Sequence, residues 1–164
     1  MSLSKAVHDS LNQQINSEFY SSYLYLSLAA YCESINFPGF AHWLRLQSAE
    51  ETSHAMRIFD FVNDRDERVL LAPIIQPPVE FESIMDVMAT ALGHERQVTN
   101  LIHNCYEIAL KEDDYATQVH LQWFITEQVE DEKSVSAIVE QLKMIGDRAD
   151  AIVLLDRDLS SRVS

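Results

Sequence analysis

The chain has 164 residues, which is the size of one domain with a substantial core, so we expect a single domain over residues 1–164. Its 12 Lys and Arg residues against 26 Asp and Glu residues give a net charge of −14 at pH 7. A negative net charge disfavours binding to the phosphate backbone of nucleic acid or to an acidic membrane surface, and it favours cations as ligands. We therefore expect no nucleic acid and no membrane as partner.

The cysteine usage and the hydropathy pattern both favour a cytoplasmic protein. Cys32 and Cys105 stand far apart in the sequence, which argues against a disulfide scaffold and against a thiolate metal site. Residues 1–30 lack a basic segment that leads into an apolar run, and no stretch of about 18 apolar residues occurs. The sequence thus indicates neither a signal peptide nor a membrane span.

The few Gly and Pro residues are clustered, and they divide the chain into long uninterrupted pieces. Ser4 is a suitable N-cap for a first helix that runs to about Cys32. A turn follows at 36–39, where Pro38 fits the first turn of a second helix that runs to about Arg65.

Three further helices are expected in the second half of the chain. One begins near Glu82 and ends near Lys111. The next is capped by Asp113 or Asp114 and ends before Gly146, and a short amphipathic helix covers about 148–159.

The segment 66–81 contains three prolines and is expected to be extended. At about 3.3 Å per residue it could reach roughly 50 Å, whereas a helix of about 27 residues is roughly 40 Å long. This connection can therefore run the full length of a bundle, while the other turns are short and make their helices antiparallel neighbours. The sequence predicts an all-α four-helix bundle with one long crossover between helices 2 and 3, plus a short C-terminal fifth helix.

Each long helix carries one stripe of core-facing residues at steps of three and four. In chain order the four stripes are Val7, Leu11, Gln14, Glu18, Ser22, Tyr25, Leu28, Cys32; Phe40, Leu44, Gln47, Glu51, His54, Ile58, Val62; Ile84, Met88, Ala91, Glu95, Val98, Ile102, Cys105; and Leu121, Phe124, Gln128, Asp131, Val135, Ile138, Leu142. All four stripes hold a carboxylate near mid-helix: Glu18, Glu51, Glu95 and Asp131. A buried, unpaired carboxylate costs several kcal/mol, and four at one level also repel one another. The nearby basic residues are out of phase with their stripes: Arg45, Arg57 and Arg96. We therefore expect bound cations at this level.

Glu51 and His54 form an E-x-x-H motif, which places both side chains on one helix face within about 6 Å. Together with Glu18 and Glu95 on two other helices, it matches the ligand pattern of dinuclear carboxylate sites in four-helix bundles. Carboxylate and imidazole ligands suit iron, manganese or zinc. The absence of nearby thiolates argues against an iron–sulfur cluster.

Over essentially its whole length, the chain resembles the non-haem bacterial ferritins of the ferritin-like superfamily. The resemblance rests on Glu18 with the tyrosine-rich run 20–25, the segment 36–41, the Glu-Glu-Thr-Ser-His run 50–54, His94-Glu95 and the run 122–130. It implies one ferritin-like domain, and a homo-oligomer in the form of a hollow shell of twenty-four subunits.

The resemblance also implies a di-iron site. A first iron is held by three side chains: Glu18, Glu51 and His54. Glu51 bridges to a second iron held by Glu95 and Asp131, with Gln128 beside it. Asp131 stands where the bacterial relatives usually have Glu, and its shorter side chain leaves two alternatives open, direct ligation or a structural hydrogen bond.

Further residues match the family pattern around this site. Three acids match a third, inner iron site: Glu50, Glu127 and Glu130. The alternative is that these three are ordinary surface acids. Tyr25 lies on the stripe of Glu18, and the resemblance favours a role with Glu51 and His54 in the chemistry over simple filling of the core. Thr52 stands where bacterioferritins carry a haem-ligating Met, so we expect no haem.

The function implied by the resemblance is iron storage and detoxification, with ferroxidase activity. Fe²⁺ is oxidised by O₂ or H₂O₂ at the dinuclear site, and Fe³⁺ is stored as mineral inside the shell. The apolar run 69–75 would be exposed on a monomer and suggests a subunit interface. Two alternatives stay open: a non-storage di-iron or manganese oxidase on the same bundle, and a purely structural cage or helical module without redox activity.

Overall fold

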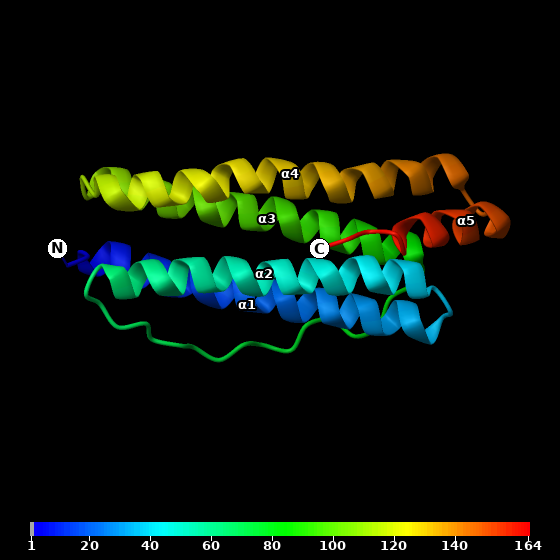
Figure 1. Cartoon of the computed structure of the whole chain (residues 1–164), viewed down its shortest axis with the longest axis horizontal. Coiled ribbons are helices and arrows are strands. Elements are labelled where there is room, and N and C mark those ends of the chain that lie inside the picture. Colours follow the sequence, from blue (N-terminus) through cyan, green and yellow to red (C-terminus); the bar gives the residue numbers. More distant parts are fainter. Residues whose placement is uncertain (1) are drawn as a thin grey trace.

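The computed structural model describes residues 2–164, and within them the chain forms helices and no strand (Figure 1). In chain order the helices are α1 (Lys5–Ser34), α2 (Pro38–Asp64), α3 (Ile84–Lys111), α4 (Tyr115–Ile145) and α5 (Ala149–Leu159). Figure 1 shows α1 beside α2 and α3 beside α4, with the connection 65–83 running along the outside of the bundle. The predicted four-helix bundle with one crossover and a short fifth helix is confirmed. No helix of this described part is long and apolar enough to cross a membrane.

The helix ends follow from local capping chemistry. Ser4 Oγ accepts a hydrogen bond from the backbone N–H of Val7, as predicted for the start of α1. Asp114, rather than Asp113, caps α4, because Asp113 occupies the turn with a φ of 53°. The start of α3 lies two residues later than the predicted Glu82, since Ser83 provides its N-cap.

The core consists of two apolar clusters separated by a polar layer. One cluster lies at the α5 end and includes Leu28, Phe40 and Leu142, and the other surrounds Leu11 and Ile58. Every residue of the four predicted stripes is buried, because each stripe follows the period of the helix. The polar layer therefore lies deep inside the bundle, between two regions that supply hydrophobic stabilisation.

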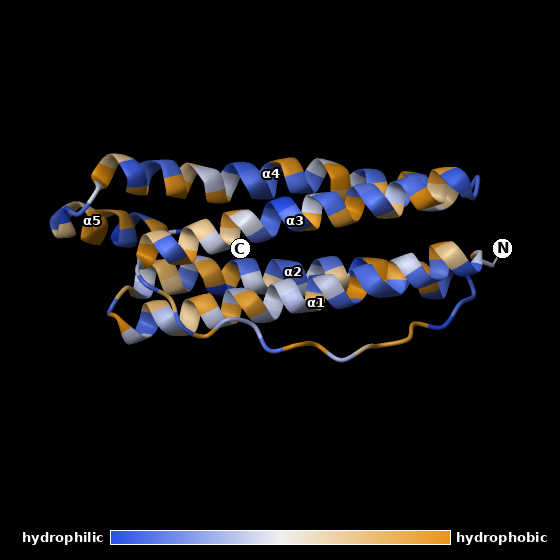
Figure 2. Ribbon diagram, turned by 180° about the vertical axis from the view of Figure 1, so that it is seen from behind, coloured by the Kyte–Doolittle hydropathy of each residue, from blue (hydrophilic) through white to orange (hydrophobic). Residues whose placement is uncertain are grey.

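The crossover is attached to α1 by a row of polar side chains. Asn12 Oδ1 accepts from the N–H of Leu70 at 2.8 Å, and Asn16 Nδ2 donates to the carbonyl oxygen of Pro73 at 3.0 Å. With its backbone bonded inward, the crossover turns apolar side chains outward, and Leu71 and Ile75 are 70% and 71% exposed. Figure 2 shows orange, hydrophobic stretches of the crossover along the outside of the bundle.

Helix α5 docks against the first turn of α2. Asp156 Oδ1 accepts a hydrogen bond of 2.9 Å from the N–H of Phe40, a free donor at this helix end. Gly39 makes the close approach possible, because a Cβ at this position would overlap the carbonyl oxygen of Asp156.

This contact yields a matched pair of substitutions. We expect Gly39→Ala to displace α5 and to lower the free energy of unfolding by about 3 kcal/mol, through overpacking. Gly93→Ala meets no atom within 4 Å and should stabilise α3 by about 0.5–1 kcal/mol. Chemical denaturation and limited proteolysis of α5 measure both effects. Equal stability of the two variants would contradict the role of Gly39.

Candidate metal centre

The four mid-helix carboxylates meet in the polar layer, as their shared depth along the helices predicts. Glu18, Glu51, Glu95 and Asp131 are all buried, with exposed fractions of 0%, 1%, 1% and 5%. The three arginines near them in sequence point to the exterior, where Arg57 covers the Trp123 ring at 3.7 Å. None of these three arginines neutralises the buried acids.

The first group of ligand atoms comes from α1 and α2. One ligand atom each from Glu18, Glu51 and His54 lies within 4.8 Å of the others. His54 Nδ1 is 3.2 Å from Glu51 Oε2 and 3.9 Å from Glu18 Oε2. The E-x-x-H spacing on one helix face produces this approach, and these are the three side chains expected to hold a first metal ion.

Two buried glutamine amides orient the carboxylates of this group. Gln14 Nε2 donates to Glu18 Oε1 at 3.1 Å, and Gln47 Nε2 donates to Glu51 Oε1 at 3.0 Å. Each glutamine stands four residues before its glutamate, so the two side chains are neighbours on one helix face. Each amide occupies one carboxylate oxygen and leaves the other for a different partner.

The second group joins the two helix pairs through the same glutamate. Ligand atoms of Glu51, Glu95 and Asp131 lie within 4.8 Å of one another. Tyr25 donates from its hydroxyl to Glu95 Oε1 at 2.6 Å, and Gln128 Nε2 donates to Glu95 Oε2 at 3.1 Å. Tyr25 and Gln128 therefore reach this group through Glu95, whose carboxylate they hold in place.

Two buried carboxylate oxygens lack any hydrogen-bond partner among the described residues: Glu18 Oε2 and Asp131 Oδ2. Buried polar atoms are rarely left in this condition, because the unmade interaction costs about 1–3 kcal/mol. Glu18 belongs to the first ligand group and Asp131 to the second. A cation bound in each group would therefore give the unpartnered oxygen of that group a ligand bond.

A third group lies at the edge of the layer, where ligand atoms of Glu50, His54 and Glu127 come within 4.8 Å of one another. The side chains of Glu50 and Glu127 are 37% and 29% exposed, so this group opens to solvent. Glu130, which the sequence assigned with Glu50 and Glu127, is exposed and stays outside the group, and His54 stands in it instead.

Burial shifts the pKa of most acids in this layer upward. Burial, followed by the charge of Glu51, raises the pKa of Glu18 and Glu95 well above the usual range, and that of Asp131 to about 8. For Glu51 burial acts in the same direction, but the hydrogen bond and charge of His54 outweigh it and lower its pKa. The site therefore retains protons that an arriving cation must displace.

Sequence reasoning overlooked the roles of some residues that support the site. Gln14 and Gln47 lie on the predicted stripes, and their spacing of four from Glu18 and Glu51 is a signal that could have revealed them. Arg162 lies 3.1 Å from Glu50 Oε1, and no local pattern indicates this contact.

These observations define a class of protein: a four-helix bundle with overlapping groups of buried carboxylate and imidazole ligands. The sequence model of the family described as Ferritin-like domain matches residues 8–145. The chain belongs to the ferritin family.

Individual relatives agree with this assignment. The bacterial non-haem ferritin of Staphylococcus epidermidis is 38% identical over 160 residues, which cover 98% of this chain and 96% of that protein. An open-pore ferritin from the hyperthermophilic archaeon Archaeoglobus fulgidus has a TM-score of 0.98 and 45% identity, covering 99% of this chain and 100% of that one. A closed form of that ferritin, engineered by site-directed mutagenesis, has a TM-score of 0.97 and 46% identity, covering 99% of both chains. The resemblance to non-haem ferritins is confirmed.

The pKa of Asp131 predicts how stability depends on pH in protein stripped of metal by a chelator. The native state holds this proton up to about pH 8, whereas the unfolded chain releases it near pH 4. The unfolded state thus binds fewer protons, and Asp131 by itself should lower the free energy of unfolding by about 1 kcal/mol between pH 7 and pH 8.

Chemical denaturation at a series of pH values measures how steeply the free energy of unfolding falls with pH. Asp131→Asn is the matched control, because the side chain of Asn does not titrate. Glu18 and Glu95, whose pKa values burial also raises, contribute in the same direction and remain in the control. His54, whose pKa is raised by Glu51 against the opposing effect of burial, does the same. An unchanged slope in Asp131→Asn would contradict the assignment to Asp131.

Proposed function

We propose that this chain is an iron-storage protein that oxidises Fe²⁺ at a dinuclear centre inside each subunit. The observation that carries the proposal is the pair of buried ligand groups that share Glu51. Glu18 and His54 complete the first group, and Glu95 and Asp131 complete the second. Membership of the ferritin family supports iron as the metal over manganese or zinc.

The donor set suits a ferroxidase. Two Fe²⁺ ions give up one electron each, and this pair of electrons reduces O₂ to H₂O₂, or H₂O₂ to water, with uptake of two protons. Hard carboxylate oxygens bind Fe³⁺ more strongly than Fe²⁺, which favours the oxidation. Tyr25, with its pKa raised by burial and by the charge of Glu95, keeps its proton and holds Glu95 in position.

Iron then passes inward through the third group, where Glu50 and Glu127 open toward solvent. Glu130 adds charge to the same surface outside that group. A net charge of −14 per subunit concentrates Fe²⁺ at pores and on the cavity wall, and salt weakens this effect.

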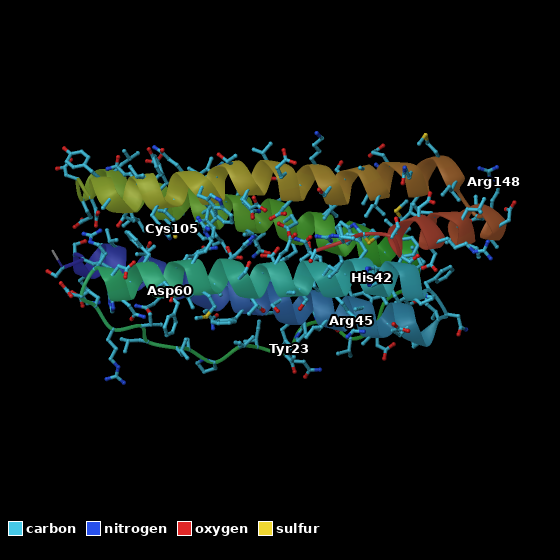
Figure 3. All side chains as sticks on the ribbon, viewed as in Figure 1. Tyr23, His42, Arg45, Asp60, Cys105 and Arg148 are labelled. Carbon is cyan, nitrogen blue, oxygen red and sulfur yellow. The ribbon has the colours of Figure 1, made fainter. Side chains whose placement is uncertain are left out.

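The storage cavity requires a shell, for which we propose twenty-four subunits as in ferritins. The exposed apolar crossover supports a subunit interface: Ile74 and Val79 line a groove with Tyr23 and Leu26 of α1. Figure 3 shows Tyr23 beside the crossover. Cys32 and Cys105 are free and buried, which fits a reducing cytoplasm.

Anaerobic titration with Fe²⁺, followed by exposure to O₂, tests the ferroxidase. The wild-type protein should bind two ions per subunit tightly and oxidise them quickly. Glu51→Ala removes the ligand shared by both groups and should reduce the initial oxidation rate by at least about 100-fold, while size-exclusion chromatography shows an intact assembly.

Glu140→Ala is the matched control, because Glu140 is an exposed acid of α4 that pairs with Lys143. This variant should oxidise iron at the wild-type rate. Rapid oxidation in Glu51→Ala would remove the site assignment, and a monomeric or dimeric wild type would remove the storage function while leaving an oxidase.

A further inference from the structure

The segment after α5 returns along α2 and brings one arginine to the edge of the metal centre (Figure 1). The carbonyl oxygen of Arg162 accepts from His42 at 2.8 Å, a residue labelled beside this segment in Figure 3. The guanidinium of Arg162 lies 4.5 Å from the centroid of the Trp43 ring, and its Nη1 donates to the Trp43 carbonyl oxygen at 3.0 Å. The side chain is 18% exposed, so several contacts hold it in one place.

The other guanidinium nitrogen contacts two residues of the centre. Arg162 Nη2 donates to Glu50 Oε1 and to Gln47 Oε1, each at 3.1 Å. Glu50 is a member of the third ligand group. A metal ion that enters this group must therefore compete with a permanent cation for the Glu50 carboxylate.

The contact with Gln47 also extends toward the buried layer. A guanidinium only donates hydrogen bonds, so Gln47 must direct its amide oxygen to Arg162 and its amide nitrogen elsewhere. That nitrogen donates to Glu51 Oε1 at 3.0 Å. Arg162 thereby fixes the orientation of the amide that holds the shared glutamate.

We propose that Arg162 is a positioning residue that acts as a tethered counter-ion at the third group and keeps this group a low-affinity site for metal. This inference rests on the proposed function, since it concerns the path of iron out of the dinuclear centre. An ion at the third group displaces the guanidinium from Glu50, and the return of the guanidinium releases the ion. The third group then transfers iron onward and does not retain it.

Equilibrium dialysis of the whole assembly against Co²⁺, at about 0.15 M salt to suppress diffuse binding, tests this inference. Co²⁺ serves as a probe that O₂ does not oxidise under these conditions. In the wild type, two ions should bind tightly per subunit and a third weakly. Arg162→Gln should increase the affinity for the third ion about two- to fivefold, as expected for removal of a partly exposed competing ion pair.

Three further variants separate the local contact from general effects of charge. Arg157→Gln removes one positive charge from the exposed face of α5 and should leave the affinity for the third ion unchanged. Glu50→Gln should abolish binding of the third ion. Arg162→Lys should give an intermediate affinity, because Lys keeps the charge but cannot contact Glu50, Gln47 and the Trp43 carbonyl together as the planar fork does.

The outcomes distinguish this inference from the proposed function. If Arg162→Gln binds the third ion with unchanged or lower affinity and still binds the first two ions tightly, the role of Arg162 alone is overturned. Failure of the wild type to bind the first two ions overturns the dinuclear centre itself. If Arg162→Gln does not assemble, Arg162→Lys decides the question, and a third-ion affinity equal to that of the wild type overturns the inference.

Discussion

Four carboxylates from four helices meet at one depth of this bundle, and their mutual repulsion and loss of hydration impose an electrostatic cost on the fold. Glutamine amides, the Tyr25 hydroxyl and His54 each neutralise part of this cost. The remainder appears as raised pKa values at Glu18, Glu95 and Asp131. A layer that retains protons when stripped of metal is one that exchanges them for cations, so the same electrostatic cost that weakens the fold provides the affinity of the proposed site.

The two apolar clusters make such a layer tolerable. They lie on either side of it along the bundle, and their burial contributes the stabilisation that an all-polar section of core cannot provide. Long helices are needed for this arrangement, because each must cross one cluster, the polar layer and the second cluster. The ligands consequently project from rigid helical backbone, which holds them close together before metal arrives.

Segments outside the four long helices adapt this common bundle to a particular use. The crossover bonds its backbone to α1 and turns Leu71 and Ile75 outward, which suits contact with another subunit. Gly39 admits α5 against α2, and the chain beyond α5 then places Arg162 on Glu50. The position of α5 thus sets where the following segment reaches the edge of the metal centre.

The sequence alone determined the helices, the Ser4 cap and the residues that face the core, because helical periodicity and capping act over only a few neighbouring residues. The convergence of Glu18, Glu51, Glu95 and Asp131 followed from the same periodicity together with the antiparallel packing that short turns require. Tertiary structure decided which oxygens the amides occupy, how Asn12 and Asn16 hold the crossover, and the exchange of Glu130 for His54 in the third group. It also decided the contact between Arg162 and Glu50, which lie 112 residues apart. Such contacts depend on helix rotation and on the path of a non-helical segment, and neither is encoded in a local pattern.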